Sequence, residues 1–103
     1  MTEMMRMDDF AGHLNTRFTM RLGESETREL ELIEAKQITL TDEQEEFSLL
    51  FLGPDNSPLA QGIYSLSHEA MGALEIFLVP IGKDRSGVTY EAYFNLLPKE
   101  FQS

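Results

Sequence analysis

The sequence predicts an all-β protein of about six antiparallel strands, arranged as a barrel or a two-sheet sandwich, with one short N-terminal helix. After residue 16, apolar and polar residues alternate with a period of two over most of the chain, which is typical of strands with one buried face. Segments rich in Gly, Pro, Asp and Asn separate these runs and are typical of turns. No long helical segment lies between two runs, so the strands are expected to pair antiparallel through short connections.

The length of 103 residues is that of a single domain. Hydrophobic residues make up 42% of the chain and charged residues 25%, a composition typical of a globular protein rather than a disordered one. The expected organisation is an N-terminal tail at residues 1–7, one β domain with its helix at residues 8–97, and a C-terminal tail at residues 98–103.

A short helix is predicted over residues 8–15. Asp8 can accept a hydrogen bond from the first turn, and Asn15 tolerates the left-handed conformation that often ends a helix. Phe10 and Leu14 are four residues apart and would share one face. We expect this face to cover one opening of a barrel or one strand that is apolar on both sides.

The predicted strands follow the helix. They cover residues 17–22, 27–35, 47–53, 61–68, 73–81 and 88–96. Ile33 directly after Leu32 interrupts the alternation and predicts a bulge. Pro80 has no N–H group to donate and predicts a strand end or an edge. The highly charged residues 41–46 are expected to form a solvated loop.

Two of these strands, at residues 47–52 and 76–79, are apolar on both faces and must be covered twice. If the helix covers only one of them, the uncovered side chains would form a contact surface for a protein partner or a second copy. This candidate interface consists of Leu50, Leu52, Phe77 and Val79. The alternative is that the helix and loops cover both strands.

The charge is strongly negative. The chain has 18 acidic and 8 basic residues, for a net charge of −10. Such a surface repels phosphate groups, which argues against nucleic acid and anionic membranes as partners and favours basic proteins. No cysteine is present, and no apolar run is long enough to span a membrane. Because no secretory signal is recognisable, a cytoplasmic location is expected, while export without a cleavable signal stays open.

No catalytic motif is found. His68 and Glu69 are adjacent, so in a strand they point to opposite faces and cannot form a dyad. The segment HEAMG lacks the second histidine of the H-E-x-x-H zinc motif, and G-x-S-x-G and Gly-rich phosphate loops are absent. We therefore predict a protein that is not an enzyme and has no metal or cofactor. His68 is interpreted as a buried framework residue that bonds to a backbone carbonyl.

A second interpretation makes the protein a small-molecule binder. The barrel end near Tyr64, His68 and Tyr90 is a candidate pocket for an apolar ligand, since barrel mouths favour such sites. A six-stranded barrel is expected to be filled by its own side chains, which counts against this interpretation.

Three segments resemble the core of a small bacterial family of domains of unknown function. They are FSLLFLGP, QGIYSLSHEAMGALEIFLVPIG and YEAYFN. The resemblance covers the chain from about Phe10 to Asn95 and implies a short, soluble bacterial protein. It also implies an association with neighbours that resemble phage-tail proteins, but it brings no activity. The first interpretation from the residues is a non-enzymatic interaction module. It would use an apolar strand face, or the acidic second strand at residues 27–35, to bind a protein partner or to associate with itself.

Overall fold

The computed structural model describes residues 6–96, which form one helix and six strands. These elements are α1 (Met7–Ala11), β1 (Arg17–Arg21), β2 (Thr27–Leu40), β3 (Glu45–Gly53), β4 (Gly62–His68), β5 (Gly72–Asp84) and β6 (Gly87–Leu96). The tails expected at residues 1–7 and 98–103 lie outside the described residues, except that Arg6 precedes the helix and Met7 begins it.

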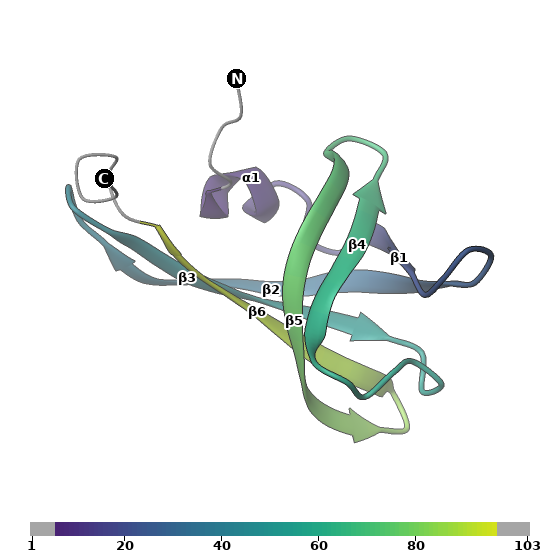
Figure 1. Cartoon of the computed structure of the whole chain (residues 1–103). Coiled ribbons are helices and arrows are strands. Elements are labelled where there is room, and N and C mark those ends of the chain that lie inside the picture. Colours follow the sequence, from purple (N-terminus) through teal and green to yellow (C-terminus); the bar gives the residue numbers. More distant parts are fainter. Residues whose placement is uncertain (1–5, 97–103) are drawn as a thin grey trace.

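The six strands form one closed barrel in the order β1-β2-β3-β6-β5-β4, with antiparallel neighbours throughout (Figure 1). The prediction of an all-β antiparallel fold with a short N-terminal helix is confirmed, and the barrel is chosen over the sandwich. The ring closes where β4 pairs with β1, at only two positions, Thr19 with Ser67 and Met20 with Leu66. By contrast, β3 and β6 pair at nine positions.

Side chains from all six strands and from α1 fill the barrel. The buried apolar residues are Phe10, Phe18, Met20, Leu30, Leu32, Phe47, Leu49, Phe51, Leu66, Ile76, Leu78, Val88, Tyr90 and Ala92. Inward and outward positions follow the predicted alternation. On β1, for example, Phe18 and Met20 are buried, whereas Arg17 and Arg21 are exposed.

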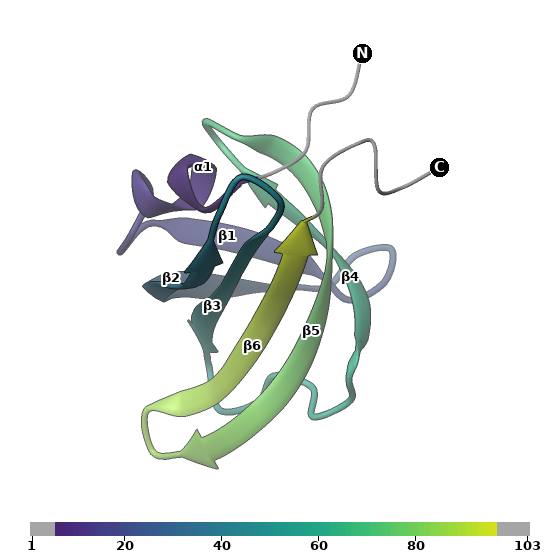
Figure 2. The same cartoon turned by 90° about the vertical axis from the view of Figure 1, so that its left-hand side faces the viewer.

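The helix α1 closes one end of the barrel. Phe10 is fully buried, and its ring centroid lies 6.3 Å from that of Phe47 and 5.7 Å from that of Phe94. At this end the pairing of β5 with β6 stops at Val79 and Glu91, and the two strands diverge beyond that point (Figure 1). Figure 2 shows α1 at the same end of the ring. The helix therefore covers an opening rather than the outer face of a strand.

The helix is shorter than the predicted residues 8–15. It begins at Met7 after Arg6, whose N–H donates to the Asp9 carboxylate at 2.8 Å, so Asp9 rather than Asp8 bonds the first turn. Leu14 follows the helix and is 38% exposed, so the prediction that it shares the buried face is wrong. Asn15 adopts φ +67°, the left-handed conformation that was expected.

The loop between β2 and β3 is also shorter than predicted. Glu45 was expected in a solvated loop over residues 41–46, but it begins β3 and is only 8% exposed. Its carboxylate accepts hydrogen bonds from Arg6 Nε at 2.8 Å and from the Met7 N–H at 3.2 Å. The polar sequence around Glu45 predicts exposure to solvent, but hydrogen bonds from residues far away in the chain stabilise its carboxylate in a buried position.

Two irregularities shape the strands. The predicted bulge is confirmed, since the register of β2 against β3 shifts between Leu32 and Glu34. Pro80 lies inside β5 rather than at its end, beside a register shift between Pro80 and Gly82. A strand tolerates proline at such a shift because the regular ladder is interrupted there.

The connection over residues 54–61 closes the opposite end of the barrel. It joins β3 to β4, which are not neighbours in the ring, so it must cross the barrel end away from α1. Ser57 in this connection is buried, and the Pro58 carbonyl accepts a hydrogen bond from Tyr90. Both ends of the barrel are therefore covered, one by the helix and one by this connection.

Candidate functional site

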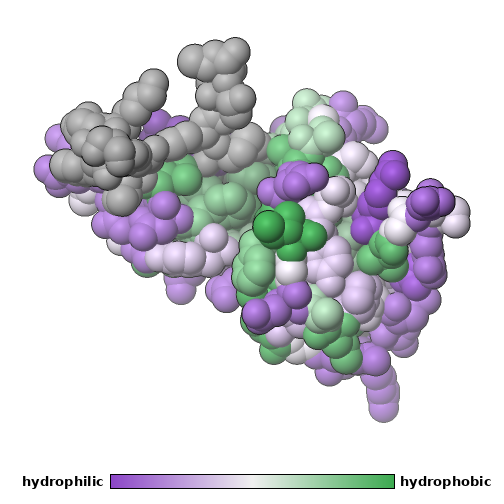
Figure 3. Space-filling model, in the orientation of Figure 1, coloured by the Kyte–Doolittle hydropathy of each residue, from purple (hydrophilic) through white to green (hydrophobic). Residues whose placement is uncertain are grey.

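Apolar side chains are exposed on the outside of the barrel. Phe77 on β5 is 50% exposed, and its cross-strand partner Ile63 on β4 is 70% exposed. Val79 on β5 and Leu50 and Leu52 on β3 are half-buried at outward positions. We name these five residues the outer apolar surface. Figure 3 shows apolar residues interspersed with hydrophilic ones on the β4–β5 side of the molecule.

The outer apolar surface contains all four residues of the predicted interface, Leu50, Leu52, Phe77 and Val79, and α1 covers none of their strands from outside. Ile63 was missed. Its signal was its outward register with the polar residues Ser65 and Ser67, but a single apolar residue between polar ones does not stand out in a sequence. That these residues contact a partner stays a prediction.

Carboxylates separate the apolar side chains. Leu50 lies between Glu34 on β2 and Glu91 on β6, and Glu91 in turn lies beside Val79 on β5. Within residues 6–96, neither carboxylate lies within ion-pair distance of a basic group. The outer apolar surface is therefore crossed by uncompensated negative charge.

Tyr93 and Glu46 place a further fixed charge near this surface. Tyr93 on β6 donates a hydrogen bond to the Glu46 carboxylate on β3, and Thr39 Oγ1 donates to the same carboxylate at 2.8 Å. These bonds, chiefly the one from Tyr93, hold the pKa of Glu46 below its ordinary value, while Glu46 raises the pKa of Tyr93. Glu46 therefore carries its charge at neutral pH.

Tyr64 and Tyr90 lie together at the end closed by residues 54–61. Their ring centroids are 6.4 Å apart. The Tyr64 hydroxyl donates to the Ala60 carbonyl and the Tyr90 hydroxyl to the Pro58 carbonyl, each at 2.5 Å. Burial raises the pKa of Tyr90 to about 12. Both hydroxyls thus bind the crossing connection.

His68 is hydrogen-bonded at both ring nitrogens. Nδ1 lies 2.9 Å from the N–H of Ala70 and 3.2 Å from that of Met71, so it accepts from both and carries no proton. Nε2 then carries the proton and donates to Thr16 Oγ1 at 2.9 Å, and this hydroxyl donates to the His13 carbonyl at 2.6 Å. The expected backbone carbonyl partner is replaced by two backbone N–H groups.

The comparison with protein families gives one result. The model described as Domain of unknown function (DUF6916) matches residues 5–94. The chain belongs to this family. No curated protein and no solved structure matches it. The resemblance to a domain-of-unknown-function family is thereby confirmed, and the description of the family names no activity.

In this DUF6916 domain the three predicted pocket residues lie in two places. His68 ends β4 at the end of the barrel that α1 closes. Its ring centroid lies 4.4 Å from that of Phe18 and 4.6 Å from that of His13. The hydroxyls of Tyr64 and Tyr90 bind the connection at the opposite end. The structure brings the two tyrosines together but not the histidine.

Metal-ligating side chains are dispersed in this family member. Among residues 6–96, no group of three or more His, Asp or Glu side chains is placed to hold a metal ion. The same part of the chain contains no helix with the length and apolar character needed to span a bilayer.

Proposed function

We propose that this domain is a non-enzymatic protein-interaction module that binds a protein partner through the outer apolar surface. The observation that carries the proposal is the cross-strand pair Ile63 and Phe77, which are 70% and 50% exposed. Fully burying a side chain of this size contributes about 1.5–3 kcal/mol relative to leaving it in water. Two such side chains next to each other favour a partner that covers them.

The surrounding charges support a basic partner. Glu34 and Glu91 flank Leu50, and Glu46 lies bonded to Tyr93 on the same strands. A partner that presents apolar side chains with Lys or Arg beside them would cover the apolar groups and compensate these carboxylates. Phage-tail-like proteins, which the family resemblance suggested as neighbours, are the first candidates to test.

Charge also favours a different protein over a second copy. Each copy of the chain carries a net charge of −10. Two copies that met through this surface would bring the uncompensated carboxylates of both faces together, which opposes association. Self-association through the outer apolar surface is therefore the less favoured form of the proposal.

The test is capture of a partner from a lysate of the source organism with the tagged protein and with two variants. Phe77→Glu places a charge in the outer apolar surface. Leu40→Glu is the matched control, because Leu40 is 60% exposed on β2 at the end of the barrel that α1 closes, away from Phe77. A stoichiometric partner identified by mass spectrometry should be retained by the wild type and by Leu40→Glu. The Phe77→Glu variant should retain at least about tenfold less.

Circular dichroism and light scattering complete the experiment. Phe77→Glu should keep the wild-type thermal unfolding curve, since the side chain points outward. The proposal is rejected if Phe77→Glu captures the partner as well as the wild type does, or if neither protein captures anything beyond the background. If light scattering shows that the wild type is a dimer and that Phe77→Glu is a monomer, the outer apolar surface binds a second copy of the chain rather than a different protein.

A further inference from the structure

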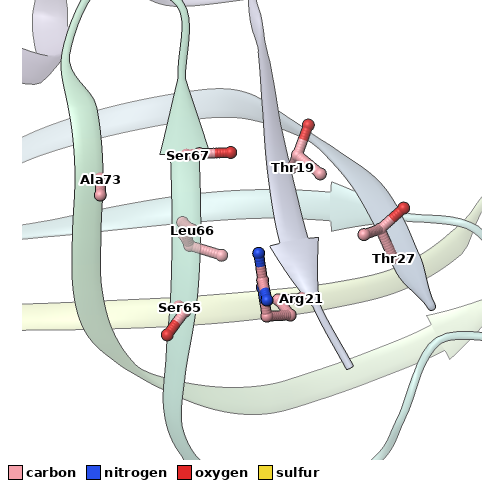
Figure 4. A pocket seen from close by; sticks show the side chains of 7 residues that line it. All are labelled: Thr19, Arg21, Thr27, Ser65, Leu66, Ser67 and Ala73. Carbon is pink, nitrogen blue, oxygen red and sulfur yellow. The ribbon is translucent and has the colours of Figure 1, made fainter. Parts of the chain in front are cut away.

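A groove opens beside the short junction between β1 and β4. The two strands pair at only two positions, and β1 ends at Arg21 while β4 extends back to Gly62. The hollow left there has a volume of about 380 Å³. We name it the seam groove. Its polar lining consists of Thr19, Arg21, Thr27, Ser65 and Ser67 (Figure 4).

The seam groove combines one guanidinium with four hydroxyls. Arg21 lies in the space between the two strands, and the Ser67 hydroxyl is directed from β4 toward β1 (Figure 4). No carboxylate contributes to the lining. Within the part of the chain that the structure describes, Arg21 forms no ion pair, and the hydroxyls of Ser67 and Thr27 form no hydrogen bond. These three groups are free to bind a ligand.

A guanidinium binds a carboxylate or phosphate through two parallel hydrogen bonds, and free hydroxyls add donors and acceptors for the hydroxyl groups of a ligand.

Two carboxylates at the edges of the groove limit the charge of the ligand. Glu29 accepts from Thr19 Oγ1 at 3.0 Å, and Glu75 accepts from Ser65 Oγ at 3.3 Å. Their repulsion disfavours a dianion such as phosphate more than a single carboxylate.

We propose that the seam groove binds a small hydroxylated monocarboxylate, with its carboxylate on Arg21 and its hydroxyls on Ser67 and Thr27. The volume lies at the lower end of the range of about 300–1,000 Å³ that is usual for small-molecule sites, which suits a ligand of sugar-acid size. This site is separate from the outer apolar surface, so it does not depend on the proposed protein partner.

The test is a titration of the ¹⁵N-labelled protein with gluconate, followed by amide chemical shifts at an ionic strength of about 0.15 M. Glucose, which has the hydroxyls without the carboxylate, and inorganic phosphate are titrated in parallel. Gluconate should produce saturable shifts confined to residues 19–21, 27 and 65–67. Glucose and phosphate should bind at least about tenfold more weakly. Glucose lacks the carboxylate that Arg21 would bind, and phosphate carries more negative charge beside Glu29 and Glu75.

Two variants and a control make the assignment specific. Arg21→Gln should weaken gluconate binding at least about tenfold, and Ser67→Ala should weaken it about threefold. Arg17→Gln is the matched control, since Arg17 is exposed on the same face of β1 but lies outside the groove. It should bind within about twofold of the wild type. All three substitutions are at solvent-facing positions, and the dispersion of the amide spectrum reports whether each variant is folded.

Three outcomes would overturn the proposal. One is that gluconate gives no saturable shift in the wild type. Another is that glucose or phosphate shifts the same amides with the affinity of gluconate. Equal binding of glucose would show that the carboxylate is not recognised, and equal binding of phosphate would show that the groove does not select a single negative charge. The last is that Arg21→Gln, folded, binds gluconate as tightly as Arg17→Gln does, since Arg21 would then not hold the carboxylate.

Discussion

Two buried polar side chains connect the barrel to the segments that close its ends. Tyr90 is fully buried and donates to the Pro58 carbonyl of the crossing connection. His68 is 8% exposed and accepts from the turn that follows β4 while it donates to Thr16. A buried polar group that loses its partner costs about 1–3 kcal/mol, so these bonds specify where the connecting segments lie.

Tyr90 should make stability depend on alkaline pH. An unfolded tyrosine has a pKa near 10, whereas burial raises the pKa of Tyr90 to about 12 in the folded protein. The unfolded chain therefore releases this proton first. The contribution of Tyr90 is complete below a pH of about 10 and is lost as the pH rises toward about 12.

Urea unfolding at a series of alkaline pH values measures this contribution. Tyr90→Phe should lower the free energy of unfolding by about 1–2 kcal/mol at neutral pH, because the Pro58 carbonyl loses its donor. The variant should also lose stability less steeply above a pH of about 10 than the wild type does. Parallel pH profiles for the two proteins would contradict the assignment to Tyr90.

The tautomer of His68 is the next prediction. The neutral ring should carry its proton on Nε2, which ¹⁵N chemical shifts of the imidazole nitrogens report directly. His68→Ala should cost about 2–4 kcal/mol of unfolding free energy, because two N–H groups lose their acceptor and a buried ring is removed. His68→Asn should recover more than His68→Gln, since the shorter side chain places its oxygen near the position of Nδ1. Equal stabilities of Asn and Gln variants would argue against this role.

At the scale of the elements, the barrel depends on the packing of the short helix α1 and on the turn between β5 and β6. The helix has only five residues, too few for stability on its own, so packing must hold it in place. Its anchor is Phe10, which contacts the rings of Phe47 and Phe94. At the turn, Gly87 brings β6 close to the backbone of β3.

Phe10 should contribute more to stability than any exposed residue nearby. Phe10→Ala removes a fully buried ring and is expected to lower the free energy of unfolding by about 3–5 kcal/mol. Leu14→Ala, at a 38% exposed position just after the helix, should cost less than about 1 kcal/mol. Chemical denaturation of both variants measures the difference, and similar losses would mean that α1 does not pack as described.

Gly87 should not tolerate a side chain. It has φ +130°, and a Cβ atom there would lie 1.9 Å from the Gly53 carbonyl oxygen. Gly87→Ala is therefore expected to cost about 2–5 kcal/mol through backbone strain and overpacking. Gly82→Ala is the control, because a Cβ atom at Gly82 meets nothing within 4 Å, and it should change stability by less than about 1 kcal/mol. Thermal unfolding of both proteins tests the contrast.

On the scale of the whole molecule, the barrel is closed unevenly. The β3–β6 ladder has nine residue pairs, whereas the β1–β4 junction has two. Cooperative units with few hydrogen-bonded pairs open at lower free energy than the core. The seam groove lies beside this weakest junction, so a ligand that bridges β1 and β4 would also strengthen the closure of the barrel.

Native-state hydrogen exchange should reveal this asymmetry. Protected amides of Thr19, Met20, Leu66 and Ser67 should exchange through local opening, at a lower free energy than those of Phe51 and Ala92 in the β3–β6 ladder. Exchange of both groups at the free energy of global unfolding would show instead that the ring opens only as a unit.

Many local features were predictable because they depend on neighbours in the chain. Alternation placed Leu50, Leu52, Phe77 and Val79 at outward positions, and the apolar neighbours Leu32 and Ile33 predicted the bulge in β2. Asn15 was expected in the left-handed conformation because its short amide side chain tolerates it. Ile63 was not recognised, since its significance comes from Phe77 on the adjacent strand rather than from its own sequence neighbours.

By itself the sequence determined the all-β class, the antiparallel strands and the inward direction of the apolar strand side chains that form the core, because turns and two-residue periodicity are local properties of the backbone. Only the tertiary structure decided that the sheet closes on itself, that α1 covers an end and that Glu45 is buried beside Arg6. It also created the seam groove, where β1 and β4 meet. These features depend on contacts between segments far apart in the chain, and the free energy of such contacts follows from three-dimensional arrangement rather than from local sequence.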